Sequence, residues 1–419
     1  LDGTLFPYTT LFRSYGLATG VIMAVILLGI SPCWAYPYVR VDGRRLLTDF
    51  DRDGRYEPFL VKGMGYSNTP IGSFPSQYGL CWYRGTSDGQ PQFECPGDQE
   101  YDNPLLLDQD LPLIKDMNAN TIRTWGKVTP ELLKKANELG LKVIAGYWIP
   151  HQLDYVNGDL AALEKDILDY VAEFKDDPAI LMWGISNENE VAFCTFKDAG
   201  PSCRREDQAA AFYKLMNTIA RKIKELEGES FHPVMMVSAD LGDIGVHAGD
   251  EALPDVDVHG CNVYRGGDFG PKANNFFQQY EKRSRKPVLI TEFGTDAWFV
   301  LGADHPERGK ERPDMQAKYI AESWDTIMAY HVTRGGPNIG GVVFQYADGW
   351  WKYKGDWDPS AATHDCGYTP DVHAGPDGYM NEEWFGVMAL EPNPVPGQLD
   401  ILHPRPAYDV IKEKFAGEL

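Results

Sequence analysis

Ile180-Leu-Met-Trp183-Gly-Ile-Ser-Asn187-Glu188 is an apolar run that ends in an amide and a carboxylate. The run predicts a buried strand over residues 180–186. Asn and Glu are poor residues for a buried strand, and their burial is costly unless they have a task there. A second run ends in Leu289-Ile-Thr-Glu292-Phe-Gly294. We therefore interpret both runs as strands that each deliver a functional carboxylate.

Similar runs recur along the chain, and amphipathic helical patterns separate them. We expect strands at 59–66, 120–125, 142–148, 180–186, 233–239, 256–264, 288–293 and 340–346. We expect helices at 105–117, 130–139, 160–174, 207–226, 274–282 and 313–331. The links after the first and fifth strands have the weakest helical pattern. Buried strands in β-α alternation predict an α/β fold, a single (β/α)8 TIM barrel. A doubly wound open sheet is the alternative, but no glycine-rich phosphate loop follows the first strand.

Two connections are much longer than the others. They follow strands 1 and 8, run over residues 66–104 and 347–404, and are rich in Trp, Asp, Gly and Pro. Loops of this length in a compact domain are usually functional. Both follow the C-terminal end of a strand, which is the face on which barrel active sites are built.

The N-terminal residues predict a short processed region. Residues 1–14 fit neither a signal peptide nor a domain start, so we interpret them as an artefactual leader. Residues 15–35 are typical of a signal peptide, with small residues around Cys33-Trp34-Ala35. The apolar run is shorter than the roughly 20 residues that span a bilayer. We expect a secreted catalytic domain over 36–419, with a retained N-terminal anchor as the alternative.

Composition narrows the class of ligand. The formal net charge of −22 repels nucleic acid and anionic membranes and favours neutral substrates over polyanions. We therefore expect no nucleic-acid partner and no stable membrane insertion after signal cleavage. Aromatic residues make up 12% of the chain, and their flat faces can stack on sugar rings, although most fill cores.

Cysteine spacing and one acidic loop give two further structural predictions. In an exported protein, Cys81 with Cys95 and Cys194 with Cys203 are typical of disulfides that staple loops, and Cys261 and Cys366 are able to pair. The Asp49, Asp51, Asp53 loop resembles the start of a calcium loop, but its twelfth position is Leu60. We predict a hairpin turn ahead of the first barrel strand, with no metal.

Glu188 and Glu292 close the fourth and seventh predicted strands, which face each other across the barrel mouth. Two carboxylates placed in this way flank one bond, as glycoside hydrolysis requires: an acid protonates the leaving oxygen and a carboxylate attacks the anomeric carbon. Retention of configuration requires the two groups about 5–5.5 Å apart. A structural ion pair is the alternative for either motif alone.

These residues resemble the glycoside hydrolases of clan A. Trp183-x-x-x-Asn187-Glu188 is similar to the acid/base strand of the family 2 barrel, and Asn120-Thr-Ile-Arg123-Thr-Trp125 resembles the fungal 1,3-β-glucanosyltransferases. The resemblance implies that Glu188 is the acid/base, that Asn187 binds the sugar 2-hydroxyl and that Glu292 is the nucleophile. It also implies that Arg123 keeps Glu292 ionised, for which a structural salt bridge is the alternative.

The resemblance extends to the substrate-binding residues. Tyr264 matches the clan tyrosine that hydrogen-bonds the nucleophile, Asn262 is a candidate for sugar binding, and Trp148 and His151 are candidate subsite residues. The clan often places a Trp after strand eight, under the reacting sugar. Tyr346, Trp350 and Trp351 are the candidates for that position. Asn189-Glu190 repeats the Asn-Glu pair, so Glu190 is the alternative acid/base, although Glu188 keeps the tryptophan spacing.

We therefore expect a secreted, monomeric, retaining glycoside hydrolase that cleaves β-linked neutral polysaccharide or oligosaccharide, such as a β-glucan or mannan. Its substrate is its expected partner, and it needs no cofactor or metal. A β-glucan transglycosylase and a non-catalytic carbohydrate-binding barrel are the alternatives.

Overall fold

The computed structural model describes residues 38–67, 69–76, 79–87, 90–94, 100–197, 199–300, 309–352, 364, 369–370 and 377–417. The predicted leader and signal peptide, Cys95 and Cys366 lie outside these residues. Across the described part, no helix has the length and apolar character needed to cross a bilayer.

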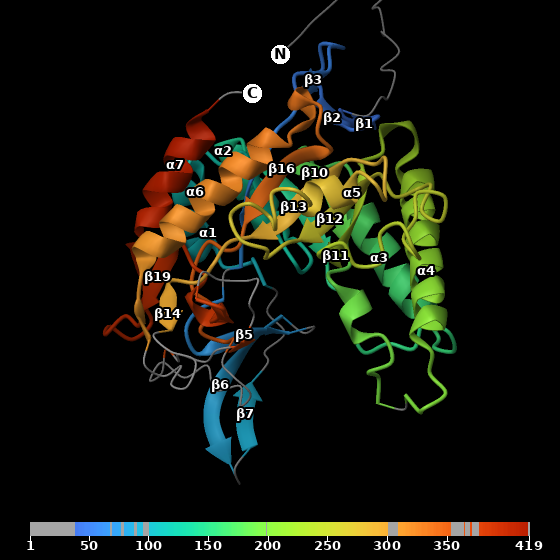
Figure 1. The fold of residues 1–419 in the computed structure, drawn as a ribbon. Coiled ribbons are helices and arrows are strands. Elements are labelled where there is room, and N and C mark those ends of the chain that lie inside the picture. The colour runs from blue at the N-terminus through green and yellow to red at the C-terminus, as the bar shows by residue number, and fades with distance from the viewer. Residues whose placement is uncertain are drawn as a thin grey trace, which may run out of the picture. The chain divides into compact units, whose positions relative to one another are not determined.

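Eight parallel strands close into a barrel, which confirms the predicted fold class (Figure 1). The order around the barrel is β10-β11-β12-β13-β16-β4-β8-β9, so sequential strands are neighbours throughout. The strands are β4 (Val61–Gly65), β8 (Thr121–Arg123), β9 (Lys142–Tyr147), β10 (Ile180–Ile185), β11 (Val234–Ala239), β12 (Val258–Asn262), β13 (Val288–Phe293) and β16 (Asn338–Val343).

Seven helices in the described part of the chain pack around the barrel, and six of them lie where the sequence predicts them. They are α1 (Pro104–Asp116), α2 (Pro130–Leu139), α3 (Ala161–Phe174), α4 (Arg205–Glu227), α5 (Phe276–Tyr280), α6 (Pro313–Ala329) and α7 (Pro406–Ala416). Helix α2 shows why the boundaries are readable. Thr129 caps its N-terminus by accepting from Leu132 N at 3.3 Å, Pro130 is its first residue, and Gly140 ends it in the left-handed region at φ 65°.

Two parts of the barrel depart from regular alternation. The link from β11 to β12 contains turns and no helix, as its weak helical pattern predicts. Helix α7 was not predicted, although Ala407, Tyr408, Ile411 and Phe415 form a buried face on it. That face packs against α6, where the rings of Phe415 and Trp324 lie 4.6 Å apart.

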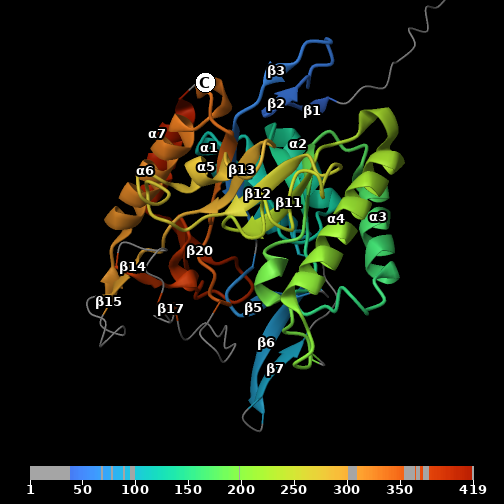
Figure 2. The ribbon, with the colours of Figure 1, turned by 45° about the vertical axis from the view of Figure 1, so that its right-hand side comes forward.

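Small additional sheets lie at the two ends of the barrel. At the N-terminal end lies a sheet of β1 (Val39–Asp42), β2 (Arg45–Thr48) and β3 (Glu57–Pro58), and at the other end β5 (Ser73–Ser76), β6 (Gly79–Ser87) and β7 (Gln90–Glu94) project outward (Figures 1 and 2). The two-stranded pairs are β14 (Trp298–Val300) with β15 (Gly309–Glu311), β17 (Thr369–Pro370) with β18 (Tyr379–Met380), and β19 (Met388–Glu391) with β20 (Ile401–Pro404).

The first of these sheets contains the acidic loop. Strands β2 and β3 pair antiparallel, which confirms the predicted hairpin turn. The Asp49 carboxylate accepts the backbone N–H groups of Asp53 and Gly54 at 3.0 Å each and so organises the turn. The hairpin is held to the barrel floor by Tyr38, whose hydroxyl donates to Ile180 O at 2.9 Å.

The cysteine predictions have a mixed outcome. Cys194 and Cys203 form a disulfide with a sulfur–sulfur distance of 2.06 Å, and Cys81 is also disulfide-bonded. Cys261 is a free, buried thiol on β12, so the pairing of Cys261 with Cys366, which the sequence left open, does not form.

Candidate active site

Glu188 and Glu292 meet at the C-terminal mouth of the barrel. Glu292 is the fifth residue of β13, and Glu188 follows the last residue of β10 by three positions. The glycine that follows β13 has a packing cause, because a Cβ atom on Gly294 would lie 2.4 Å from Phe344 O. Only glycine allows this close approach between the ends of β13 and β16.

Three donors surround the Glu292 carboxylate. Its Oε1 atom accepts Arg123 Nη1 and Trp125 Nε1, each at 2.8 Å, and its Oε2 atom accepts the Tyr264 hydroxyl at 2.8 Å. Burial and the negative charge of Glu292 raise the pKa of Tyr264 well above its usual range, so the phenol stays a donor. A carboxylate that only accepts hydrogen bonds suits this set of donors.

Asn262 and Arg123 connect the two glutamates. The amide of Asn262 donates to Glu188 Oε1 at 2.8 Å and to Asn187 Oδ1 at 3.1 Å. Arg123 Nη2 donates to the same Asn187 oxygen at 2.7 Å, while its Nη1 contacts Glu292. Thr291 orients Asn262 by donating to its side-chain oxygen at 2.8 Å. The structure thus brings the five residues expected at the centre of the site into one network with Glu188.

Glu188 has the electrostatic character of a proton donor. Burial, followed by the negative charge of Glu292, raises the pKa of Glu188 to about 7. The bond from Asn262 opposes this rise but does not outweigh it. The two carboxyl groups are therefore close enough to interact, and the raised pKa of Glu188 is what a proton donor beside a nucleophile requires.

Glu190 points away from this network. Its Oε1 atom accepts the Ala239 N–H at the end of β11 at 2.7 Å, and the residue is 5% exposed. Burial raises the pKa of Glu190 to about 8. Its carboxyl group makes no hydrogen bond in the described part of the mouth that would join it to Glu292 or Asn262. The geometry therefore favours Glu188 over Glu190 as the acid/base.

The residues expected after strand three lie at the edge of the same mouth. Trp148 is 44% exposed, and its ring stacks on His151 with 4.7 Å between ring centroids. His151 Nε2 lies 2.7 Å from Asn187 O, which links this pair to the loop that carries Glu188. Burial lowers the pKa of His151.

The three candidates after strand eight lie in different surroundings. Tyr346 is 1% exposed and donates to Asp110 of α1 at 3.2 Å, so it belongs to the core and its assignment to the sugar site is wrong. Trp350 is buried with one face stacked on His364 at 4.6 Å. Trp351 is half-buried and lies 5.3 Å from the Lys352 ammonium.

The cause is a strand end that was predicted three residues too late. Strand β16 ends at Val343, and the following peptides bond elsewhere: Gln345 N donates to Phe385 O at 3.3 Å and Tyr346 N donates to Gly65 O at 3.0 Å. Phe344, the first residue after β16, is therefore the aromatic residue of this segment that packs against two partners of the nucleophile. Its ring lies 5.6 Å from Trp125 and 6.2 Å from Tyr264.

Sequence reasoning also missed an ion pair and a donor beside the reacting groups. The Lys352 ammonium lies 4.2 Å from the Phe344 ring centroid and 3.1 Å from Glu382. Glu382 is close enough to raise the pKa of both Glu188 and Tyr264. Trp125 stands two residues after Arg123, and the alternation of strand residues is the signal that would have placed both at the mouth.

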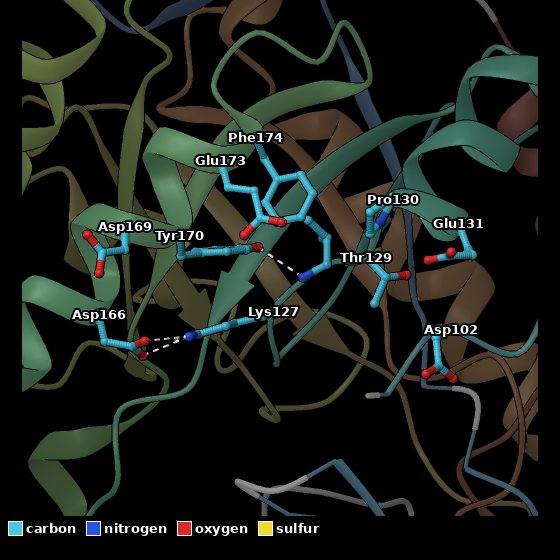
Figure 3. A pocket seen from close by; sticks show the side chains of 11 residues that line it. Asp102, Lys127, Thr129, Pro130, Glu131, Asp166, Asp169, Tyr170, Glu173 and Phe174 are labelled. Atoms are coloured by element: carbon cyan, nitrogen blue, oxygen red, sulfur yellow. Dashed lines mark hydrogen bonds and ion pairs between the residues drawn. The ribbon is translucent and has the colours of Figure 1, made fainter. Parts of the chain in front are cut away.

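A groove on the outside of the barrel is separate from this site. It lies between α2 and α3 and has a volume of about 540 Å³ (Figure 3). Five of its lining side chains are carboxylates, and Lys127 pairs with one of them, Asp166, at 2.7 Å. The lining includes neither glutamate of the mouth nor their partners, so the groove carries no part of the chemistry.

A parallel barrel with interacting glutamates at the ends of its fourth and seventh strands is built like the retaining glycoside hydrolases. Within that class, the chain is similar to β-glucuronidases. It is 25% identical to mouse β-glucuronidase over 260 residues, covering 59% of this chain and 36% of the relative. It is also 34% identical to mouse β-mannosidase, over 83 residues that cover 19% of this chain and 9% of that protein. No model of a known protein family matches the chain.

Solved structures give the same fold. A family 2 β-galacturonidase from Eisenbergiella tayi has a TM-score of 0.54 and 18% identity, covering 90% of this chain and 53% of that one. A β-D-glucuronidase from Dictyoglomus thermophilum has a TM-score of 0.53 and 17% identity, with 91% and 54% covered. The chain thus resembles the family 2 catalytic barrel of clan A and spans about a third of the mouse β-glucuronidase it matches. None of these relatives is a 1,3-β-glucanosyltransferase, so that resemblance is not supported.

Proposed function

We propose that the chain is a retaining β-glycosidase that works by double displacement, with Glu292 as nucleophile and Glu188 as acid/base. The observation that carries the proposal is the contrast between the two carboxyl groups. Glu292 accepts three hydrogen bonds, whereas burial and the charge of Glu292 raise the pKa of Glu188 to about 7.

The first step forms a bond between a Glu292 oxygen and the anomeric carbon. The glycosidic carbon–oxygen bond breaks, its electron pair stays on the leaving oxygen, and the proton of Glu188 goes to that oxygen. Asn187 offers its amide N–H groups to the sugar, because Arg123 and Asn262 already occupy its oxygen. In the second step, water attacks the anomeric carbon, Glu188 takes its proton, and Glu292 leaves.

The stereochemistry of the released sugar tests this mechanism. Proton NMR of the hydrolysis of an aryl β-glycoside should show the β anomer first, with the α anomer appearing only through later mutarotation. The α anomer as first product would indicate inversion. Binding of sugars without turnover on any aryl β-glycoside would instead support the non-catalytic carbohydrate-binding barrel.

Transglycosylation is a second candidate, favoured by the exposed Trp148 ring. That ring lies on the Glu188 side of the mouth, because β9 and β10 are neighbours and Tyr147 pairs with Ile185. An acceptor sugar stacked there would compete with water for the covalent intermediate. Oligosaccharides longer than the substrate indicate transfer, whereas shorter products alone indicate hydrolysis.

For the sugar, we propose a neutral hexose, as in a β-mannan or β-glucan. Three cations near the mouth in the described part of the chain are already paired: Arg123 with Glu292, Lys352 with Glu382 and Arg265 with Asp240. A uronate would have to displace one of these carboxylates beside a reacting pair that is itself acidic. The partial similarity to mouse β-mannosidase also supports a neutral sugar.

A uronic acid is the competing candidate. The similar β-glucuronidases and β-galacturonidase support it, and the Lys352 ammonium could exchange Glu382, whose side chain is 45% exposed, for a sugar carboxylate. The two candidates therefore differ in the Lys352–Glu382 ion pair: a neutral sugar leaves it intact, whereas a uronate replaces Glu382.

A panel of matched 4-nitrophenyl β-glycosides should separate the two candidates. We expect kcat/KM for the mannoside or glucoside to exceed that for the glucuronide and galacturonide by at least about tenfold, because an uncompensated buried charge costs more than about 1.4 kcal/mol. Lys352→Met should then change kcat/KM for the preferred neutral glycoside less than kcat/KM for the uronides. A uronide that is preferred, and that loses its preference in Lys352→Met, would establish the opposite assignment.

We also propose that the protein is exported. The Cys194–Cys203 disulfide supports an oxidising compartment, because such bonds are rare where thiols are kept reduced.

A further inference from the structure

The loop that carries Glu188 has an unusual backbone. Ser186 and Glu188 both adopt positive φ angles, 75° and 53°, which side-chain-bearing residues rarely do. Such conformations persist only when surrounding contacts hold them. The direction of the Glu188 carboxyl group therefore depends on what anchors this loop.

Strand β11 provides the anchor through two consecutive ladder positions. The regular pairing of β10 with β11 ends at Ile185 and Met236. Beyond the kink at Ser186, the Glu188 N–H donates to Val237 O at 3.0 Å. Two residues further along β11, on the same edge of the strand, the Ala239 N–H bonds to the Glu190 carboxylate at 2.7 Å. The side chain of Glu190 thus takes the place that a backbone carbonyl would have in a continued ladder.

The surroundings of Glu190 fit a structural acceptor rather than a solvated charge. The residue is 5% exposed, and a Cβ atom on Gly242 would lie 2.6 Å from its Oε1 atom, so the carboxylate is enclosed from that side. Asn189 holds the opposite side of the loop by donating to Ile149 O at 3.0 Å and to the Tyr155 hydroxyl at 3.2 Å. Glu188 lies between Asn187, which is part of the catalytic network, and these two buried anchors.

We propose that Glu190 is a positioning residue that aims the Glu188 carboxyl group at the leaving oxygen by accepting the Ala239 N–H. The inference rests on the proposed role of Glu188 as acid/base. It explains the second Asn-Glu pair as an anchor for the first, and it assigns Glu190 no contact with the substrate.

The test compares two substitutions on two substrates of the same sugar, a phenyl β-glycoside and a 2,4-dinitrophenyl β-glycoside. Glu190→Leu removes the acceptor, and Glu190→Gln keeps one. Since the dinitrophenolate leaves without a proton, only the phenyl glycoside needs a well-aimed acid. We expect Glu190→Leu to lower kcat/KM, which reports the acid-dependent first step, by about 10- to 100-fold for the phenyl glycoside, because a misplacement of 1 Å can cost about 100-fold. For the dinitrophenyl glycoside kcat/KM should fall by less than about threefold, and Glu190→Gln should stay near wild type on both.

A second pair of variants disturbs the same contact from outside. Gly242→Ala pushes a methyl group toward the Glu190 carboxylate, whereas Gly228→Ala adds one at a positive φ of 67° with no atom within 4 Å. Both replacements strain a left-handed glycine, so only the first should show the loss that depends on the leaving group. If Glu190→Leu fails to fold, Gly242→Ala and Gly228→Ala still test the inference.

The outcomes separate this inference from the proposed function. A wild-type protein that is inactive on both aryl glycosides overturns the proposed function. An active wild type with equal losses on the two substrates in Glu190→Leu or Gly242→Ala overturns only the positioning role. Loss in Glu190→Gln as large as in Glu190→Leu would also overturn it, because the acceptor would not be the cause.

Discussion

Replacing Glu292 by glutamine is expected to lower kcat by at least roughly 10⁴-fold on every β-glycoside, whatever its leaving group, because the nucleophile takes part in both chemical steps. Glutamine keeps the shape of the side chain and can still accept from Arg123 and Trp125, which both bond to one oxygen of Glu292. The loss would therefore report the missing negative charge and nucleophilicity rather than a collapsed site. Steady-state kinetics with a 2,4-dinitrophenyl β-glycoside measures it.

Glu227→Gln is the matched control. Glu227 is a buried carboxylate at the opposite end of the barrel, where it accepts Trp183 Nε1 at 3.0 Å and lies 2.7 Å from His232. Its replacement should affect stability but leave kcat close to wild type. A Glu292→Gln variant that retains more than about 1% of wild-type activity on the activated substrate would contradict the assignment of the nucleophile.

The sequence predicts the barrel well because burial and alternation are local properties. Each barrel strand is an apolar run bounded by polar or glycine residues, and the observed strand over Val288–Phe293 and helix over Pro130–Leu139 agree with the expected bounds. Glu188 and Glu292 were found for the same reason: a charged residue at the end of a buried run is conspicuous, and strand order places those ends at one mouth. Arg123 was identified only through the resemblance of its motif to a known family.

The parts that were missed depend on contacts between distant segments. Strand β16 ends where it does because the N–H groups of Gln345 and Tyr346 donate to Phe385 O and Gly65 O. Nothing near Val343 in the sequence indicates these two hydrogen bonds. Tyr346 therefore enters the core, and Phe344 takes the place beside Tyr264. Likewise, only the fold shows that Lys352 and Glu382, thirty residues apart, form a pair beside the reacting groups.

Glu188→Ala should have a large effect that depends on the substrate. A phenyl β-glycoside needs a proton on its leaving oxygen, so its kcat/KM should fall by about 10²- to 10⁴-fold, the usual contribution of a general acid. A 2,4-dinitrophenyl β-glycoside leaves as a stable anion, so its kcat/KM should fall by less than about tenfold. The wild-type profile on the phenyl substrate should decline above pH 7, because the raised pKa of about 7 keeps Glu188 protonated only below that value. Glu188→Ala should lose this alkaline limb.

Azide distinguishes loss of the acid/base from its displacement. In Glu188→Ala, azide can enter the vacated space and attack the anomeric carbon of the intermediate. The carbon–oxygen bond to Glu292 then breaks and a β-glycosyl azide is released. Glu190→Leu keeps the Glu188 carboxylate, which repels the anion, so azide should not restore its activity. Rescue of a Glu190 variant but not of Glu188→Ala would make Glu190 the acid/base, despite the bond that its carboxyl group accepts from Ala239.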